Sequence, residues 1–407
     1  MQTQILTEQK IDVAHLATGM YVYRLDRDWL DTPFSLEGFY IQSAEDIQAL
    51  RKICDYVIID LKRSNLNFIV NQYHENPPEK KLKVREYFNT VTITEELPKA
   101  KLAHENAISL ASNIISDVRD GKKLNLEDVR SAVEPVVQSM LRNADAFFWI
   151  SNLRKRDAYQ YSHAINCSLL AVALGRHMGF AESVLMNLAT GGLLLDIGKS
   201  ELPQEMLDNP EPLGRTEMVM MRRHVVFSMQ IIESSGVHNL DVMNMIRTHH
   251  ERYDGSGYPG QLCRNQIPLF GRMAAVIDSY DAMTSHRPYR KLMSPHKALQ
   301  EIYRQRDVLY QSDIVEQFMQ CLSVYPTGSL VELNSGEVAI VMAQNQARRL
   351  RPRVMILTTR DKKLKESFDE IDLFMHALGD GQNEHLEIVG TLESGAYGID
   401  PSELYLT

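Results

Sequence analysis

Residues 249–260 carry the sequence HHERYDGSGYPG, which does most to decide the fold class of this chain. The two histidines end an apolar segment, and glycine and proline then recur at a density that stops a helix and makes a loop. On both sides, from residue 147 to about residue 321, apolar residues recur at helical spacing. The stretch therefore predicts a polar loop between the helices of a large helical domain.

The sequence outside the helical region predicts two smaller parts. GMYVYRL and YVIIDL predict strands that flank a helix in SAEDIQALRKI, whereas SLVELNSGEVAIVMAQN predicts a hairpin and RVMILTT a further strand. We therefore expect a multidomain, mainly α-helical protein with a small α+β N-terminal domain and a small β-rich C-terminal segment. The expected bounds are 1–90 for the N-terminal domain, 91–146 for a helical linker, 147–322 for the helical domain and 323–407 for the β-rich appendage.

Composition excludes several classes of protein. The net charge of −9 argues against a nucleic-acid polymer as partner, because binding to a phosphate backbone needs a basic face. No apolar run approaches the roughly 20 residues that span a membrane, and the polar start lacks a signal-peptide pattern, so we expect a cytoplasmic protein. The cysteines are far apart and lack CxxC spacing, which predicts free thiols.

Several histidines and aspartates lie among apolar neighbours of the helical region. These residues are His163, Asp196, His224, His249, His250 and Asp278. A single inward histidine is usually a hydrogen-bonded core residue, and a single aspartate at a helix end is usually a cap. Together, however, such groups are unfavourable to bury unless they share a cation. The set therefore predicts a metal site.

Imidazole mixed with carboxylate suits iron, manganese, zinc or nickel. Asp196, which follows the apolar run Leu193-Leu194-Leu195, is the candidate to bridge two ions. A pair of ions polarises a phosphodiester and lowers the pKa of a water, which supplies an attacking hydroxide without a side-chain nucleophile. The predicted reaction is phosphodiester hydrolysis.

Three motifs resemble those of the HD-GYP phosphodiesterase family. HHERYDGSGYP resembles the family signature HHExxDGxGYP, LLDIGK resembles its HDxGK element, and DSYDAMTSHRPYR at 278–290 resembles its D-x-x-D-A-[LM]-T-x-x-R-P-Y-R segment. The resemblance covers about residues 159–290. GMYVYRLDRDWLDTPF resembles the N-terminal domain of unassigned function found in a subset of the family.

The resemblance implies a helical domain that hydrolyses cyclic di-GMP to pGpG or GMP with one or two ions of iron or manganese, or else zinc or nickel. It assigns His163, Asp196 and Asp278 to a first ion, and Asp196, His224, His249 and His250 to a second. It implies that Lys199 contacts the scissile phosphate or the leaving oxygen, that Tyr258 contacts the nucleotide, and that Arg287 and Arg290 bind phosphate.

One position departs from the family pattern. Leu195 stands where the family has the histidine of its HD doublet, so the first ion loses a ligand. Tyr159 stands where some members carry a glutamate, so we expect at most two ions. Three outcomes stay open: an enzyme weakened by Leu195, a receptor that binds cyclic di-GMP without cutting it, or a hydrolase of another nucleotide. The sequence also leaves open a protein signalling partner and a homodimer.

Overall fold

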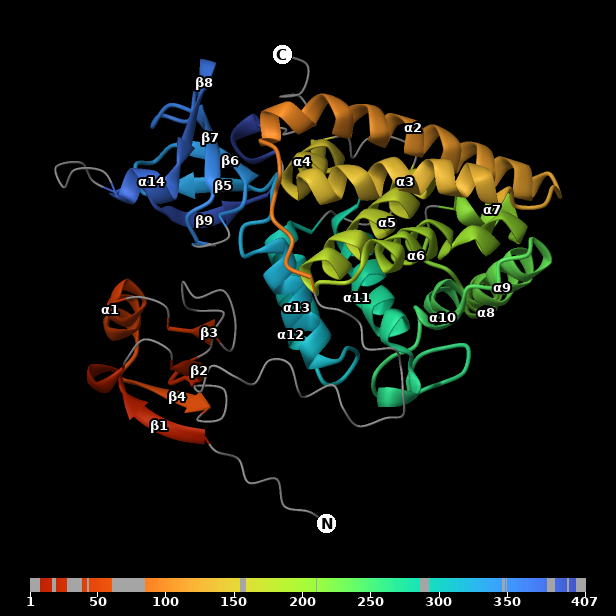
Figure 1. Ribbon diagram of the computed structural model, residues 1–407, viewed down its shortest axis with the longest axis horizontal. Coiled ribbons are helices and arrows are strands. Elements are labelled where there is room, and N and C mark those ends of the chain that lie inside the picture. The colour runs from red at the N-terminus through yellow and green to blue at the C-terminus, as the bar shows by residue number, and fades with distance from the viewer. Residues whose placement is uncertain are drawn as a thin grey trace. The chain divides into compact units, whose positions relative to one another are not determined.

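The structure is a computed structural model, and it divides into two compact units, Met1–Lys81 and Leu82–Thr407 (Figure 1). It describes residues 8–16, 20–27, 39–41, 44–60, 85–153, 159–209, 211–285, 293–345, 348, 350–378, 385–393 and 395–399. Each unit is treated by itself below. Helices dominate the second unit and small antiparallel sheets lie toward the two ends of the chain, so the predicted fold class is confirmed.

The first unit is a four-stranded antiparallel sheet with one helix, as the alternation of strand and helix patterns predicts. Its elements are β1 (Glu8–Asp12), β2 (Tyr21–Leu25), β3 (Phe39–Tyr40), α1 (Ala44–Ile53) and β4 (Tyr56–Asp60), with strand order β1-β4-β2-β3. The apolar residues of YVIID and of the helix face meet in one core, in which Val22, Leu50 and Val57 have no exposed surface. Burial of these side chains holds the unit together.

The second unit begins with two long helices that are packed on the rest of the helical domain. They are α2 (Ile93–Arg119) and α3 (Leu126–Arg142), which contact each other and also α5 and α6. Small residues line the buried face of α2, and the buried Glu96 in that face forms an ion pair with the half-buried Arg142 at 2.7 Å. The segment expected to be a helical linker therefore contributes a layer of helices to the second unit, whereas the predicted domain bounds stay predictions.

The remaining helices of the domain include α5, which packs against α6, α11 and α13. They are α4 (Ala144–Leu153), α5 (Tyr159–His177), α6 (Glu182–Leu194), η3 (Ile197–Glu201), α7 (Gln204–Leu207), α8 (Arg215–Arg222), α9 (His224–Ser234), α10 (Leu240–Thr248), α11 (Leu269–Thr284), α12 (Pro295–Arg304) and α13 (Ser312–Leu322). Residues 163–175 of α5 are all buried, so this stretch of the helix has no face exposed to solvent. The expected inward stripe at His163 is thus one side of a helix that is buried all round.

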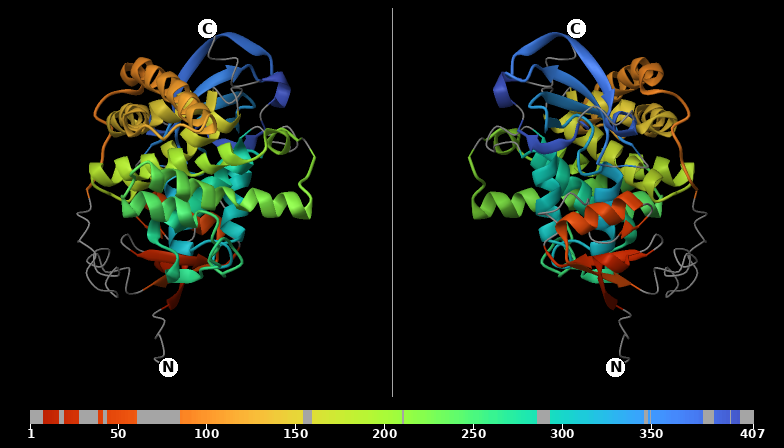
Figure 2. Two further views of the ribbon diagram at one scale, coloured as in Figure 1. Left: turned by 90° about the vertical axis from the view of Figure 1, so that its right-hand side faces the viewer. Right: turned by 90° about the vertical axis from the view of Figure 1, so that its left-hand side faces the viewer.

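The C-terminal part of the second unit is a five-stranded antiparallel sheet, and Figure 2 shows its strands, in blue, at one end of the helices. Its elements are β5 (Leu330–Leu333), β6 (Val338–Ala343), β7 (Arg353–Thr358), β8 (Leu364–Asp372), α14 (Leu373–Leu378) and β9 (Ile388–Leu392), with strand order β8-β7-β6-β5-β9. The predicted hairpin is present as β5 and β6, with Gly336 at φ +88° in its turn. Strand β6 packs against α4, which joins the sheet to the helices.

None of the helices in the described ranges combines the length and the apolar character that crossing a bilayer requires. The cysteines that the structure describes are free thiols, in agreement with the expectation from their spacing.

Candidate metal centre

Asp196 is placed by a tight turn at the C-terminal end of α6. After Leu195 the chain enters η3, which passes against the first turn of α9. Gly198 permits this approach, because a Cβ atom there would lie 2.1 Å from the carbonyl oxygen of His224 and 2.3 Å from the amide nitrogen of Ser228. The Ser228 hydroxyl accepts from Gly198 N at 2.9 Å and donates to Leu195 O at 3.1 Å. The turn therefore brings Asp196 beside His224.

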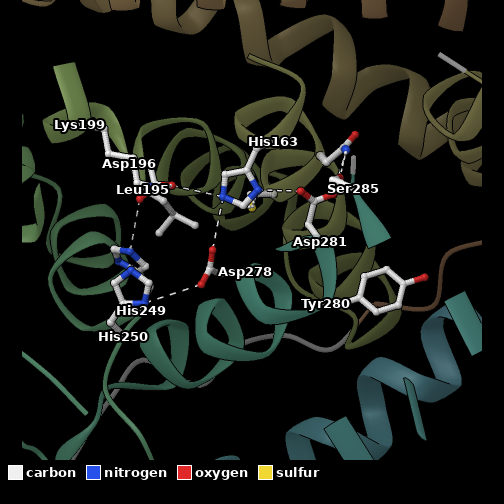
Figure 3. A network of polar contacts seen from close by, with 12 residues as sticks. His163, Leu195, Asp196, Lys199, His249, His250, Asp278, Tyr280, Asp281 and Ser285 are labelled. Atoms are coloured by element: carbon white, nitrogen blue, oxygen red, sulfur yellow. Dashed lines mark hydrogen bonds and ion pairs between the residues drawn. The ribbon is translucent and has the colours of Figure 1, made fainter. Parts of the chain in front are cut away.

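Four predicted ligands converge next to this turn, and Figure 3 shows three of them, Asp196, His249 and His250. Asp196, His224, His249 and His250 each offer one ligand atom, and these atoms all lie within 4.8 Å of one another. His224 Nε2 lies 3.2 Å from Asp196 Oδ1 and 3.4 Å from His249 Nε2, and the distance from His249 Nε2 to Asp196 Oδ1 is 3.8 Å. We call these four residues the four-donor cluster.

Backbone carbonyl groups fix the protonation of two of these rings. His224 Nδ1 lies 2.7 Å from Met221 O, and His249 Nδ1 lies 2.7 Å from Ile246 O. A carbonyl oxygen can only accept, so each Nδ1 carries a proton and donates it. In the neutral rings both Nε2 atoms then present lone pairs toward the same point. Metal-binding histidines are commonly oriented in this way.

The four-donor cluster fits a divalent cation. Asp196 Oδ1 is buried and makes no hydrogen bond within the described part of the chain. It and two imidazole lone pairs face one another at 3.2 to 3.8 Å, and acceptors at such a distance repel unless a positive charge lies between them. Nitrogen and carboxylate oxygen are suitable ligands for iron, manganese, zinc or nickel.

A second group of candidate ligands lies on the other side of Asp196. His163 Nε2 is 3.3 Å from Asp196 Oδ2 and 3.3 Å from Asp278 Oδ1, and the three residues form a set with metal-ligand spacing. Leu195, which is 2% exposed, offers no ligand atom here. We call His163, Asp196 and Asp278 the three-donor cluster. Asp196 belongs to both clusters, as a bridging carboxylate would.

Asp281 orients His163, and the sequence analysis did not assign it a role. His163 Nδ1 donates to Asp281 Oδ2 at 2.6 Å, which directs Nε2 toward the three-donor cluster. Asn166 Nδ2 at 2.8 Å and Ser285 Oγ at 2.9 Å donate to the other oxygen, and Ser151 Oγ donates to Asn166 Oδ1 at 2.7 Å. The available signal was the i, i+3 spacing from Asp278 on one helix, which places both carboxylates on one face.

The two carboxylates of the centre are held in their charged form. Burial would raise the pKa of Asp196, but in the metal-free chain the charge of Lys199, and donation from His163 and His224 when their Nε2 atoms carry a proton, hold it well below its ordinary value. Burial would likewise raise the pKa of Asp278, yet a hydrogen bond from His163, when Nε2 carries the proton that a bound cation would replace, keeps it far below that value. Lys199 lies one turn after Asp196 and donates to Asp196 Oδ2 at 2.5 Å.

Two histidines of the four-donor cluster are held neutral. Burial, together with the neighbouring His224, lowers the pKa of His249 to about 4. Burial and the adjacent His249 lower the pKa of His250 well below its ordinary value. At neutral pH these rings therefore keep a lone pair available for a metal ion.

The loop after His250 is anchored by Glu251, which is 1% exposed. Its two carboxylate oxygens accept from the backbone amides of Gly260 at 2.6 Å and Leu262 at 3.0 Å. Gly257 lies so close to the start of the loop that a Cβ atom would come within 2.4 Å of Arg252 N. The glycines and the glutamate thus fold the loop back onto its own first residues.

This folding places Tyr258 against the four-donor cluster. Its ring lies 4.6 Å from the His250 ring at an interplanar angle of 30°, and the Arg222 guanidinium lies 5.0 Å from the centre of the Tyr258 ring. The predicted nucleotide contact is thus adjacent to the candidate ligands. Arg287 and Arg290, the predicted phosphate contacts, lie outside the described residues.

Comparison with protein families covers all three parts of the chain. Residues 140–314 match the HD domain, residues 8–129 match a domain of unknown function, DUF3391, and residues 330–377 match a KOW domain associated with the HD domain. The HD domain match contains every residue of both clusters.

Curated proteins similar to this chain are cyclic-dinucleotide phosphodiesterases. A cyclic di-GMP phosphodiesterase of Pseudomonas aeruginosa is 29% identical over 90% of this chain and 89% of its own length. A cyclic di-GMP phosphodiesterase of Thermotoga maritima is 34% identical over 40% of this chain and 45% of its own. A 3'3'-cGAMP-specific phosphodiesterase of Vibrio cholerae is 28% identical over 51% of this chain and 36% of its own.

Proposed function

We propose that this chain, which belongs to the HD-GYP family of HD-domain proteins, is a metal-dependent phosphodiesterase that hydrolyses cyclic di-GMP to pGpG or GMP. One observation supports the proposal more than any other. Asp196, His224 and His249 point acceptor atoms at one another within 3.8 Å, although none has a donor to offer there. Such an arrangement is unfavourable without a cation and useful with one.

We assign the ligands of the two ions as follows. Asp196, His224, His249 and His250 would hold one ion, and His163, Asp196 and Asp278 would hold the other. When bound, divalent ions polarise a phosphodiester and make water a stronger nucleophile. Iron or manganese suits the mixed imidazole and carboxylate ligands, with zinc or nickel as alternatives.

The two clusters differ in their capacity to bind. In the four-donor cluster the protein supplies all four ligand atoms. In the three-donor cluster Leu195 supplies none, so water would have to complete the coordination of an ion there. We therefore propose that the first ion to bind goes to the four-donor cluster and that the other site fills at higher metal concentration.

Residues beside the ions would bind the substrate. Lys199 carries a charge next to the bridging carboxylate, where an ammonium stabilises the scissile phosphate or the leaving oxygen. Tyr258 gives a flat wall over His250, against which a nucleotide can stack. Arg287 and Arg290 stay predictions from the sequence as phosphate ligands.

The identity of the substrate comes from the relatives. The proteins from Pseudomonas aeruginosa and Thermotoga maritima are named for cyclic di-GMP, and we extend that substrate to this chain. A cytoplasmic location, a homodimer and a protein signalling partner are retained as predictions from the sequence.

The second candidate function is a receptor that binds cyclic di-GMP without cutting it. Leu195 is the observation that favours it, because an apolar side chain stands beside the three-donor cluster. Such a receptor would keep the metal of the four-donor cluster as part of its nucleotide site.

A hydrolysis assay separates the two functions. The purified chain is supplied with manganese or ferrous iron and cyclic di-GMP, and pGpG and GMP are measured by chromatography. The enzyme produces pGpG or GMP, and chelation stops it. His224→Ala removes activity, whereas His238→Ala, which changes an exposed histidine, does not. Binding of cyclic di-GMP without product under every metal establishes the receptor, and absence of both binding and product refutes the proposal.

A further inference from the structure

The second unit contains a cavity of about 690 Å³. It lies on the side of His163 that faces Asp281, away from the metal ligands. Helices α4, α5, α11 and α13 form its walls, and the rest of the lining comes from residues 85–89, from the segment 323–327 and from residues 344–345, just after strand β6. This volume falls in the range of pockets that bind small molecules.

The cavity is separate from the metal centre but touches its support. None of the seven candidate positions 163, 195, 196, 224, 249, 250 and 278 is in its lining. Asn166 and Asp281, however, both line it, and both belong to the hydrogen-bonded chain that ends at His163 Nδ1. Figure 3 shows the His163 ring between Asp278, which belongs to the metal centre, and Asp281, which lines the cavity.

Arg176 is a half-buried cation in the lining that has no acidic partner in contact among the described residues. Arg176 donates to Asn89 Oδ1 at 3.0 Å, and it forms no ion pair with any residue that the structure describes. Its guanidinium lies 5.8 Å from the centre of the Tyr87 ring. Its Nε atom is buried and has no hydrogen-bond partner in the described part of the chain, and partial burial lowers the pKa of Arg176. A guanidinium in this state is suited to an anion or a carbonyl from a ligand.

A buried carboxylate stands in the same lining, held apart from the cation by Asn89. Asp145 accepts from Asn89 Nδ2 at 3.3 Å, from Gln344 N at 3.2 Å and from the Thr327 hydroxyl at 3.3 Å. These are long hydrogen bonds for a charged acceptor, and a carboxylate has about four acceptor sites. Asp145 can therefore accept further donors.

Aromatic and aliphatic side chains complete the lining. Tyr87, Phe148 and Tyr280 supply aromatic rings, and Leu169 and Leu170 of α5 add aliphatic surface. The cavity thus combines flat apolar walls with a forked cation and a carboxylate. A planar heterocycle that has both donors and acceptors on its edges is the class of ligand that uses all three features.

We infer that this cavity binds a guanine mononucleotide. Guanine presents two adjacent N–H donors, which match the Asp145 carboxylate, while Arg176 is suited to guanine O6 and N7 or to the phosphate. Adenine offers an acceptor where guanine offers its ring N–H, so it lacks the donor pair that a carboxylate prefers. The choice of ligand rests on the proposed function, because hydrolysis of cyclic di-GMP yields guanine nucleotides.

A ligand in the cavity is expected to affect the metal centre through Asn166. A ligand that contacts Asn166 or Asp281 changes the hydrogen bonds that direct His163 toward Asp196 and Asp278. GMP bound there is therefore expected to inhibit hydrolysis without competing with the substrate.

Calorimetry of the full chain tests the site in the presence of a chelator, so that no ion at the metal centre can hold the phosphate. We expect GMP to bind at least ~10-fold more tightly than AMP, and Arg176→Gln to weaken GMP binding at least ~10-fold. Asp145→Asn is expected to bring the two nucleotides within about threefold of each other, because an amide does not favour the donor pair. Arg304→Gln, an exposed change on α12 outside the lining, leaves binding unchanged.

The inference is wrong if the wild-type chain binds no GMP, if AMP binds as tightly as GMP, or if both cavity variants bind GMP like the wild type. Thermal unfolding followed by circular dichroism identifies a variant that has not folded, and the remaining cavity variant then decides. Because binding is measured without metal or turnover, failure of hydrolysis and failure of this inference are separate results.

Discussion

The two halves of the metal centre share Asp196 but are built with different numbers of donors. The four-donor cluster brings His224, His249 and His250 to one side of this carboxylate. The three-donor cluster brings only His163 and Asp278 to the other side, where the buried Leu195 offers no ligand atom. One half is thus equipped to bind a cation with protein atoms alone, and the other depends on water.

The halves also differ in how their histidines are oriented. Backbone carbonyls of Met221 and Ile246 fix two rings of the four-donor cluster, so these rings depend only on the helices that carry them. His163 instead relies on the Asp281 side chain, which in turn is held by Asn166. The three-donor cluster therefore has an outer hydrogen-bonded support, although Leu195 offers no ligand atom there. Such support is typical of histidines that bind a metal ion.

Removing a ligand from the four-donor cluster should have the largest effect. His249→Ala is expected to lower metal affinity and hydrolysis at least ~100-fold, since loss of a direct ligand exceeds the 10- to 100-fold range seen for outer-shell changes. Metal content of the purified variant and the rate of cyclic di-GMP hydrolysis provide the measurement. His238→Ala is the control, and equal losses in both variants would contradict the role of this cluster.

A side chain added in the turn that positions Asp196, the residue shared by both halves, should have the second-largest effect. Gly198→Ala places a Cβ atom 2.1 Å from His224 O and 2.3 Å from Ser228 N, both backbone atoms that cannot give way cheaply. We expect the free energy of unfolding to fall by about 3 kcal/mol, together with loss of bound metal. Denaturant unfolding measures the change. Gly390→Ala, where nothing lies within 4 Å of the added atom, should unfold like the wild type.

Loosening the support of the three-donor cluster should have a smaller effect. Asp281→Asn turns the acceptor of the His163 proton into an amide, so the ring loses a charged partner at 2.6 Å. We expect a 10- to 100-fold fall in hydrolysis, as for other outer-shell changes, while the four-donor cluster keeps its ion. Metal content and activity are measured on the same sample. Loss of all metal would show that the two halves do not bind independently.

Adding a ligand at position 195 should have the smallest effect on hydrolysis, and it tests directly whether the two halves differ by that ligand. Leu195→His adds an imidazole beside Asp196, and we expect a second ion to bind at lower concentration and hydrolysis to rise about tenfold. Titration with manganese and the rate of product formation measure both effects. Leu195→Phe supplies a ring without a donor. If both variants behave alike, position 195 does not face the metal.

The predicted ligands come together because helices fix where their side chains point. The expected helical pattern after residue 147 placed His163, His224 and His249 among buried neighbours, and all three are buried. Asp281 was missed although it is the second aspartate of the D-x-x-D segment, because neither the motif nor its i, i+3 spacing from Asp278 shows that it bonds a histidine on another helix. Its partner Asn166 is 115 residues away along the chain, a contact that only tertiary packing creates.

Local sequence patterns could not predict two other features of the fold. The charged segment expected to link two domains packs on α5 and α6, because its small residues form a continuous buried face. Strand β9 pairs with β5 across more than 50 residues, whereas the predicted hairpin of β5 and β6 is a local pairing. Two strands that are neighbours in the sequence are joined by a turn whose residues can be recognised. Two strands that are far apart in the sequence leave no such signal of their pairing.

A crystal structure of the manganese-loaded chain, with anomalous scattering measured at the manganese edge, tests the four-donor cluster most directly. We predict a peak surrounded by Asp196, His224, His249 and His250, stronger than any peak beside His163 and Asp278. A map with no peak at the four-donor cluster, or with manganese only at the three-donor cluster, would contradict the claim that this half of the centre binds the first ion.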